Sequence, residues 1–450
     1  MRLHLYQFAI VGALAASVGN AREALAQGYG VYEQGSCTMA RAGAAVASPC
    51  NDGSAIFFNP AALVNAPNRV SIGGTLIAPS GGFTNSLTGH RDDLANKVYP
   101  VPHAFVTAQL RPRLVGGIGL FAPYGLTSDW SPDAEGRFLG HHSRIEGLYL
   151  QPTLAYQLTP RVSVGAGFDL SLVSVGLKRR VDLAGQLVPG GGGLTFANLG
   201  IASGTDFADV NLTGNGTGVG YHIGVLVRAT DRLSFGARYL SRQLVKISDG
   251  KAEISQVNTG LVVPADLPSP TNPGVVAIPR GTPIDIVLAP EFANGGPLAD
   301  QSAATYLRFP DQLVLGLAYQ VTPRAKLLFD YQYTNWHVFD QLEIDLANLG
   351  PVVYYQNNHE THDFRLGGEY ALSESTELRL GAYTHNAAAP SSAVIPNLPE
   401  GPRTSFTAGL GTRLTNSLHL DLAYQYIDQA DRRGRTVDLG PVRPRGTDNN

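Results

Sequence analysis

The sequence lacks the long apolar runs of a helical membrane protein. A membrane-spanning helix needs about 20 mainly apolar residues in a row, and no such stretch follows the N-terminal region. Charge is also scarce, because Asp, Glu, Lys and Arg make up 15% of the 450 residues, against about 25% in soluble proteins. The chain therefore fits poorly with several soluble domains, the usual expectation for this length. A net charge of -3 also argues against a nucleic-acid partner.

Cysteine and methionine are nearly absent, with 2 of each. The N-terminus predicts a signal peptide over residues 1–26, since Arg2 precedes an apolar run that ends before the small-x-small pattern at Ala24 and Ala26. A membrane-anchor helix is the alternative, but the apolar run is too short for it. An exported chain meets an oxidising compartment, so we expect a disulfide between Cys37 and Cys50, with two free thiols as the alternative.

Glycine and tyrosine are plentiful, at 52 and 19 residues, and the chain alternates apolar with small or polar residues. Residues 161–172 and 416–426 show this period of two, which is typical of strands. Six short turns join such segments, and long Gly/Pro-rich stretches separate the resulting hairpins. The two longest stretches cover residues 178–216 and 249–304. Short turns at one end and long loops at the other are typical of outer-membrane barrels; a soluble sandwich or propeller is the alternative.

The pattern predicts an all-β protein, a 14-stranded antiparallel transmembrane β-barrel over residues 68–450. The expected strands begin near Arg69, Val98, Leu114, Ser143, Arg161, Gly216, Arg232, Leu307, Arg324, His362, Thr376, Arg403, Ser417 and Arg435. A barrel of this width is too wide for its own side chains to fill. Residues 27–67 alternate poorly and carry the cysteine pair, so we expect them to form an N-terminal plug, or hatch, in the lumen. A disordered tail is the alternative.

The segment from Gly43 to Asn59-Pro60-Ala61 resembles the plug region of the long-chain fatty acid transporter (FadL-type) family, also called the toluene-transporter family. Further similar segments occur in the family's order along nearly the whole mature chain, at Pro152 to Tyr156, Leu315 to Tyr319 and Leu366 to Tyr370. The resemblance implies a bacterial outer-membrane channel for passive uptake of long-chain fatty acids or aromatic hydrocarbons. It also implies contact with outer-membrane lipid and lipopolysaccharide, a monomer, and neither cofactor nor metal.

The resemblance implies three further features. A kink in the third strand opens the wall sideways, and we expect it at Gly116, Gly117 and Gly119, where packing against the plug is the alternative explanation. Loop residues form an apolar capture groove, although they could simply pack on each other. The ligand contacts expected from the plug, the loops and the inward-facing arginines are Phe57, Phe58, Phe196, Leu199, Ile286, Leu288, Arg238 and Arg379.

Charged residues on the inward positions have two interpretations. By alternation these residues are Asp169, Arg238, Asp330, Arg379 and Asp421. They could form a structural network that holds the plug, or an arginine could bind a ligand carboxylate. We favour the network.

A general diffusion porin and an outer-membrane hydrolase remain as alternative functions. The adjacent His142 and Ser143 do not set up the geometry of nucleophile, base and orienting group. The segment from His359 to His362 also lacks the spacing of the helical zinc-protease motif. We therefore expect a protein that is not an enzyme.

Overall fold

The alternating segments form one antiparallel sheet in the computed structural model, which describes residues 29–66, 68–269, 271–272 and 274–436. The sheet contains 17 strand elements, and each strand pairs with the next along the chain. Four of the wall strands are interrupted once, and each of these is counted as two elements. The 17 elements therefore make up thirteen wall strands. The predicted signal peptide lies outside the described residues, and so does nearly all of the predicted fourteenth strand.

The wall elements are β1 (Arg69–Ile77), β4 (Tyr99–Arg111), β5 (Leu114–Asp129), β6 (His142–Thr159), β7 (Val162–Asp182), β8 (Asp206–Arg228), β9 (Leu233–Leu240), β10 (Gln243–Gln256), β13 (Gln301–Phe309), β14 (Gln312–Thr322), β15 (Ala325–Thr334), β16 (Gln341–Leu346), β17 (Gly350–Tyr355), β18 (Thr361–Ala371), β19 (Thr376–His385), β20 (Arg403–Arg413) and β21 (His419–Gln429). The interrupted strands are β9/β10, β13/β14, β15/β16 and β17/β18. This architecture confirms the predicted all-β antiparallel barrel.

Short elements lie inside the barrel and in the loops. The plug holds α2 (Ser36–Met39), α3 (Ala55–Phe58) and the 3-10 helix η2 (Pro60–Asn65). The loops hold β2 (Gly82–Thr84) with β3 (Arg91–Asp93), β11 (Leu267–Pro268) with β12 (Val276–Ile278), η3 (Glu135–Phe138), η4 (Phe196–Leu199), α4 (Ile284–Phe292), η5 (Trp336–Phe339) and η6 (Ser391–Ala393). No helix in the described residues is long and apolar enough to cross a membrane.

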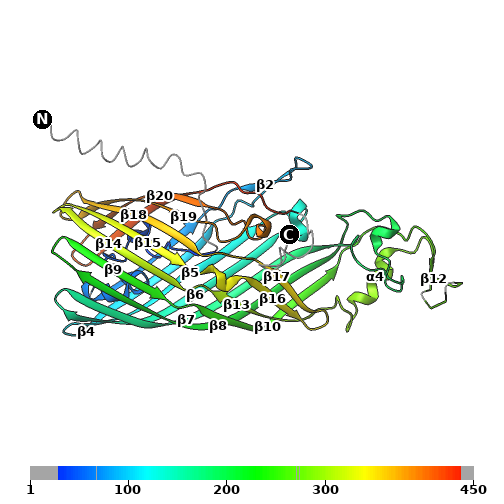
Figure 1. The fold of residues 1–450 in the computed structure, drawn as a ribbon, viewed down its shortest axis with the longest axis horizontal. Coiled ribbons are helices and arrows are strands. Elements are labelled where there is room, and N and C mark those ends of the chain that lie inside the picture. The colour runs from blue at the N-terminus through cyan, green and yellow to red at the C-terminus, as the bar shows by residue number, and fades with distance from the viewer. Residues whose placement is uncertain (1–28, 67, 270, 273, 437–450) are drawn as a thin grey trace, which may run out of the picture.

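The connections sort by end, as the sequence predicts. Tight turns follow β4, β6, β8, β14, β18 and β20, and they gather at one end of the barrel, whereas α4 and β12 extend from the other (Figure 1). The loop predicted over residues 178–216 is shorter than expected and covers 183–205. Its Gly- and Asn-rich edge is strand, because residues 206–215 of β8 pair with β7. The strands therefore extend past the apolar part of the wall.

The two faces of the wall differ as a membrane barrel requires. On β8, Val219, Tyr221 and Ile223 face outward and are exposed, whereas His222 and Leu226 face inward and are buried. The outward faces form an apolar band that suits lipid. All five charged residues predicted to face the lumen are inward; four are buried, and Asp421 is partly buried.

Candidate functional site

Residues 29–66 fill the lumen, and most of their side chains are buried. The Cys37–Cys50 disulfide closes the first part of this plug, with a Cα–Cα distance of 6.2 Å. It confirms the predicted pairing. The plug turns back on itself within the narrow lumen. It can do so because glycines at positive φ, such as Gly35, Gly43 and Gly53, separate its short helical turns.

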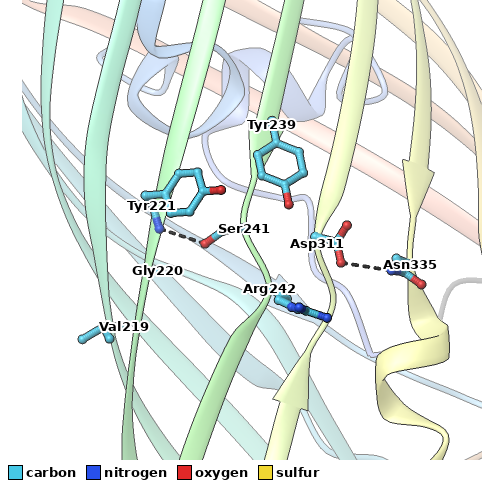
Figure 2. A pocket seen from close by; sticks show the side chains of 8 residues that line it. All are labelled: Val219, Gly220, Tyr221, Tyr239, Ser241, Arg242, Asp311 and Asn335. Atoms are coloured by element: carbon cyan, nitrogen blue, oxygen red, sulfur yellow. Dashed lines mark hydrogen bonds between the residues drawn. The ribbon is translucent and has the colours of Figure 1, made fainter.

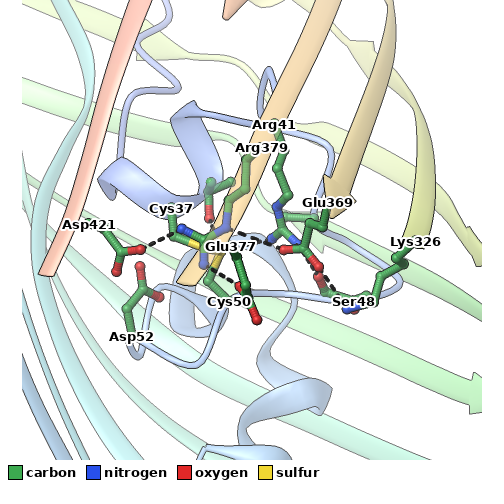
Figure 3. Close-up of polar contacts among 12 residues, drawn as sticks. Cys37, Arg41, Ser48, Cys50, Asp52, Lys326, Glu369, Glu377, Arg379 and Asp421 are labelled. Carbon is green, nitrogen blue, oxygen red and sulfur yellow. Dashed lines mark hydrogen bonds and ion pairs between the residues drawn. A yellow bond between two sulfur atoms is a disulfide. The ribbon is translucent and has the colours of Figure 1, made fainter. Parts of the chain in front are cut away.

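A network of charges ties the disulfide region to the wall at the end with the tight turns (Figure 3). Arg41 of the plug lies 2.8 Å from Glu369 of β18, and Glu369 also pairs with Lys326 of β15 at 2.9 Å. Arg379 of β19 bridges Glu369, Glu377 and Asp421 at 3.6, 2.7 and 2.5 Å. All the recorded partners of Arg379 are protein carboxylates, which favours the structural interpretation of this residue.

Two further charged side chains hold the backbone of the plug. Asp330 of β15 accepts hydrogen bonds from the N–H groups of Ala45 and Val46 at 2.7 and 3.0 Å. Arg365 of β18 donates to the carbonyl of Ala42 at 3.0 Å and pairs with Asp363 at 2.9 Å. Both ends of this tight turn of the plug are therefore fixed by buried charge.

Arg238 of β9 lies against the aromatic part of the plug. Its guanidinium donates to the carbonyl of Phe57 at 3.0 Å and to Gln312 at 2.6 Å. It also stacks over the Phe57 ring, 4.6 Å from the centroid, a cation–π contact. Its Nε has no hydrogen-bond partner among the described groups, so one donor stays available in the lumen.

The Asn-Pro-Ala element of the plug, Asn59 to Ala61, contacts the wall at β7 and β8. Asn59 donates to the carbonyls of Val46 and Val225 at 2.7 and 3.0 Å, and its Oδ1 caps η2 by accepting from Ala61 at 3.1 Å. Pro60 and Ala61 pack on Gly165 of β7, where any side chain would clash. The element thus joins plug, helix start and wall.

Aromatic side chains fill the lumen between the plug and the loops. The rings of Phe57 and Phe58 pack edge to face, with an interplanar angle of 76° and centroids 4.9 Å apart. The Phe57 ring also packs on Phe121 of β5, with centroids 5.1 Å apart. The cluster continues through Tyr29, Phe105, Tyr124, Tyr149, Phe309, Trp336 and Phe339. A cavity between Phe58 and Arg238 has a volume of only about 10 Å³, room for about one water. A ligand of any size would need these rings to move.

The third strand bends at a different place from the predicted one. The ladder of β5 runs without a break through Gly116, Gly117 and Gly119. The last two glycines make room for Ile56 of the plug, since a Cβ would lie 2.9 and 3.0 Å from its side chain. The register shift falls between Phe121 and Tyr124 instead. The register shift falls here because Pro123 has no N–H and cannot donate a hydrogen bond to the neighbouring strand.

The ladder pairing between β4 and β5 stops just before this register shift. Their pairing ends at Ala104 and Leu120, although β4 continues to pair with β1 and β5 with β6. The start of the plug lies against the bulge: Val31 donates to the Pro123 carbonyl at 2.8 Å, and Gln34 donates to the Ala122 carbonyl at 2.6 Å. The bulge carbonyls are therefore satisfied by the plug rather than by a neighbouring strand.

The long loops pack into an apolar core of their own. Phe196 and Leu288 are fully buried there, Leu199 is partly buried, and Ile286 is 64% exposed. Packing of the loops on each other thus accounts for Phe196 and Leu288. Leu187 and Val262 are two further exposed apolar side chains of the loops.

A buried acid holds another loop. Glu400 accepts hydrogen bonds from the N–H groups of Ala388 and Ala389 at 2.7 and 3.3 Å and pairs with Arg432 at 3.0 Å. Burial raises the pKa of Glu400 from 4.5 to about 7, against the opposing effects of these partners. The alternation of the strands gave no signal for this loop contact.

Two hydroxyl groups that lie near histidines, those of Ser143 and Thr153, are both buried. His142 pairs with Asp129 at 2.6 Å, while Ser143 donates to the Asn397 carbonyl at 2.5 Å. The His222 ring lies between Thr153 and Asp169, with 2.8 Å from its Nε2 to the Thr153 Oγ1 and 2.5 Å from its Nδ1 to the Asp169 Oδ1. This order of groups is like that of a hydrolase triad, but all three side chains are almost fully buried. It joins β6, β7 and β8 across the lumen face.

Comparison with known proteins adds the following. A family model described as outer membrane protein transport protein (OMPP1/FadL/TodX) matches residues 17–440. The long-chain fatty acid transport protein of Escherichia coli K12 is 23% identical over 424 residues, which cover 90% of this chain and 88% of that protein. Outer membrane protein P1 of Haemophilus influenzae Rd is 21% identical, with 94% and 89% covered.

Solved structures share the fold. A Pseudomonas aeruginosa FadL homologue has a TM-score of 0.71 at 20% identity, covering 89% of this chain and 92% of that chain. The Pseudomonas putida toluene transporter TodX has a TM-score of 0.63 at 19% identity, covering 89% and 93%.

Proposed function

Because the chain belongs to the outer membrane protein transport family (OMPP1/FadL/TodX), we propose that it is an outer-membrane channel for passive uptake of hydrophobic compounds. Long-chain fatty acids and monoaromatic hydrocarbons are the candidate substrates, since relatives are named for their transport. One observation carries the proposal. Among the described residues, a buried plug meets an aromatic cluster inside the barrel, and the cavity beside Phe58 holds only about 10 Å³, so the cluster offers apolar surface where a porin would need open, water-filled space.

The path begins at the loops. Ile286, Leu187 and Val262 are exposed apolar side chains that could receive a hydrophobic molecule, because exposed apolar groups gather where something binds. Phe196, Leu199 and Leu288 form the core beneath them, so we assign these three residues the role of supporting the capture surface.

The path continues to the plug. Phe58 lines the small cavity, and both Phe57 and Phe58 belong to the aromatic cluster, so their rings would move aside to admit a ligand. Arg238, with its unpaired Nε, is the group best placed to meet a fatty acid carboxylate. We do not extend that role to Arg379, whose recorded partners are carboxylates of the wall.

The exit is lateral. The gap between β4 and β5 lies beside the Ala122–Pro123 bulge, next to Phe121 of the aromatic cluster. An apolar molecule that moves along this cluster would reach the bilayer there rather than the aqueous periplasm. Movement of the segment around Val31, which binds the bulge, would control the opening.

Ligand binding to the detergent-purified protein tests the proposal. A fluorescent long-chain fatty acid would be displaced by unlabelled fatty acid or by p-xylene, and the better competitor identifies the substrate class. Phe58→Ala should change the affinity, whereas Phe329→Ala, an exposed ring on the lipid face, should leave it unchanged. If neither compound class binds the wild-type protein, the proposed function fails.

The alternatives predict other results. A general diffusion porin would show large, steady conductance in planar bilayers. An outer-membrane hydrolase would cleave lipid or peptide and lose that activity in Ser143→Ala.

A further inference from the structure

Three unpaired cations gather on the outer face of the wall where β10 and β13 pair. Leu244 of β10 lies opposite Arg308 of β13 in this ladder. Arg242 and Lys246 lie two residues to either side of Leu244. Each is therefore a diagonal neighbour of Arg308, at about 7–8 Å between Cα atoms. The three cations are exposed, and none of them forms an ion pair or a side-chain hydrogen bond with another described residue. Like charges this close repel one another, so this cationic cluster favours the binding of an anion.

No acid lies within ion-pair distance of the cationic cluster in the described part of the chain. Asp249 lies in the bulge of β10, and Asp311 follows β13, where its Oδ1 accepts from the Asn335 side chain at 3.1 Å. Elsewhere on the wall cations do pair, as on β6, where the Arg144 guanidinium lies 3.9 Å from Glu146. The cluster therefore differs from a surface ion pair and keeps a net positive charge.

The cationic cluster lies on the long-loop side of the apolar band. β10 leads into the long loop over residues 257–300, and β13 returns from it. At the other end of the cluster, Arg242 shares a pocket with Val219 and Tyr221, two exposed side chains of the band. In outer-membrane barrels the long loops face the outside of the cell and the tight turns face the periplasm. The cluster therefore faces the outer leaflet, whose lipid is lipopolysaccharide.

The pocket that Arg242 lines opens on the outer surface of the wall and has a volume of about 410 Å³ (Figure 2). This volume falls in the range of about 300–1,000 Å³ that is usual for small-molecule sites. Its polar lining includes the hydroxyl groups of Tyr221 and Tyr239, the Asp311 carboxylate and the Asn335 amide. Such groups donate hydrogen bonds to sugar hydroxyl groups or accept from them, and the Asp311 Oδ2 has no hydrogen-bond partner among the described groups. The pocket therefore suits a sugar that lies beside an anion.

We propose that the cationic cluster and the pocket together bind the phosphorylated glucosamine headgroup of lipopolysaccharide. Arg242 and Arg308 would bind phosphate with parallel donors, and Lys246 would add a third positive charge. Asp311 would accept from a sugar hydroxyl group, which accounts for an acid beside the cations. Leu244 is exposed between the cations and would contact the acyl chains. A phospholipid with a single phosphate fits less well, because it offers no sugar to the pocket and less charge to the cluster.

Native mass spectrometry of the protein, refolded in detergent without lipopolysaccharide, tests the site. The protein is titrated, in the presence of a chelator, with lipid A that carries two phosphates and with the same lipid after both phosphates are removed. Each exposed ion pair contributes up to about fivefold to affinity. The wild-type protein should therefore bind the phosphorylated lipid at least about tenfold more tightly. The triple variant Arg242→Gln, Lys246→Gln and Arg308→Gln should lose this preference.

The matched control is a second triple variant, Arg161→Gln, Arg232→Gln and Arg324→Gln. It removes the same charge from exposed positions in the tight turns at the opposite end of the barrel, and it should keep the wild-type preference. Slower gel migration of each variant after heating shows that its barrel was folded. The proposal is overturned if the first triple variant keeps the preference, if the control loses it, or if the wild-type protein binds dioleoylphosphatidylglycerol as tightly as phosphorylated lipid A. None of these results would affect the fatty acid competition above, so the two proposals fail separately.

Discussion

Replacing Asp330 by alanine should release the plug. The Asp330 carboxylate accepts the N–H groups of Ala45 and Val46 at 2.7 and 3.0 Å, inside the barrel and away from solvent. A hydrogen bond to a charged group contributes about 1.5–3 kcal/mol, so the two together contribute roughly 3–6 kcal/mol to docking. At about 1.4 kcal/mol for each factor of ten, the undocked population should rise by roughly two to four orders of magnitude.

Single-channel recording in planar bilayers measures this population. The wild-type protein should be nearly silent, because the plug fills the lumen. Asp330→Ala should show frequent large openings, since an unplugged barrel of this width conducts ions. The matched control is Asp231→Ala, which removes an exposed acid from the turn after β8 and should remain silent.

Limited proteolysis gives an independent measure. Arg41 is buried in the docked plug, so cleavage after it reports undocking. If Asp330→Ala is as silent as the wild type and is cleaved no faster, the assignment of Asp330 as an anchor of the plug is wrong.

Three further predictions concern stability. Changing Cys37 and Cys50 to serine should destabilise the plug by about 3 kcal/mol, the value for a loop of roughly 15 residues in the chain-entropy model, with faster amide exchange within the plug as the readout. Phe57→Ala, which removes a fully buried ring, should destabilise the barrel by about 3–5 kcal/mol in thermal unfolding, whereas Phe329→Ala should cost less. Because burial raises the pKa of Glu400 from 4.5 to about 7, its contribution is fully present below pH 4.5 and is lost as the pH rises through about 7. The protection of its loop amides, taken as the exchange rate relative to the intrinsic rate at each pH, should therefore fall over that interval in the wild type and stay constant in Glu400→Gln.

The sequence predicts the strands well because alternation and lipid exposure are local properties. Most expected starts, such as Arg69, Leu114 and Thr376, agree with the structure within one or two residues. The strand predicted to begin near Gly216 begins at Asp206 instead. The Gly- and Asn-rich residues in between pair with β7 on one side and β10 on the other. Pairing with neighbouring strands, rather than the intrinsic preference of these residues, therefore determines their strand conformation.

The site was less predictable, since it depends on contacts between distant segments. Glycines suggested the kink, but Gly117 and Gly119 accommodate Ile56, and Pro123 marks the bulge instead. A proline inside a strand was the available signal.

Uptake by intact cells tests the central claim most directly. The protein would be produced in a Gram-negative host that lacks its own long-chain fatty acid transporter, and entry of radiolabelled oleate, toluene and a hydrophilic sugar would be timed. The account predicts faster entry of oleate or toluene and no change for the sugar. Unchanged entry of both hydrophobic compounds, or faster entry of the sugar, would contradict it.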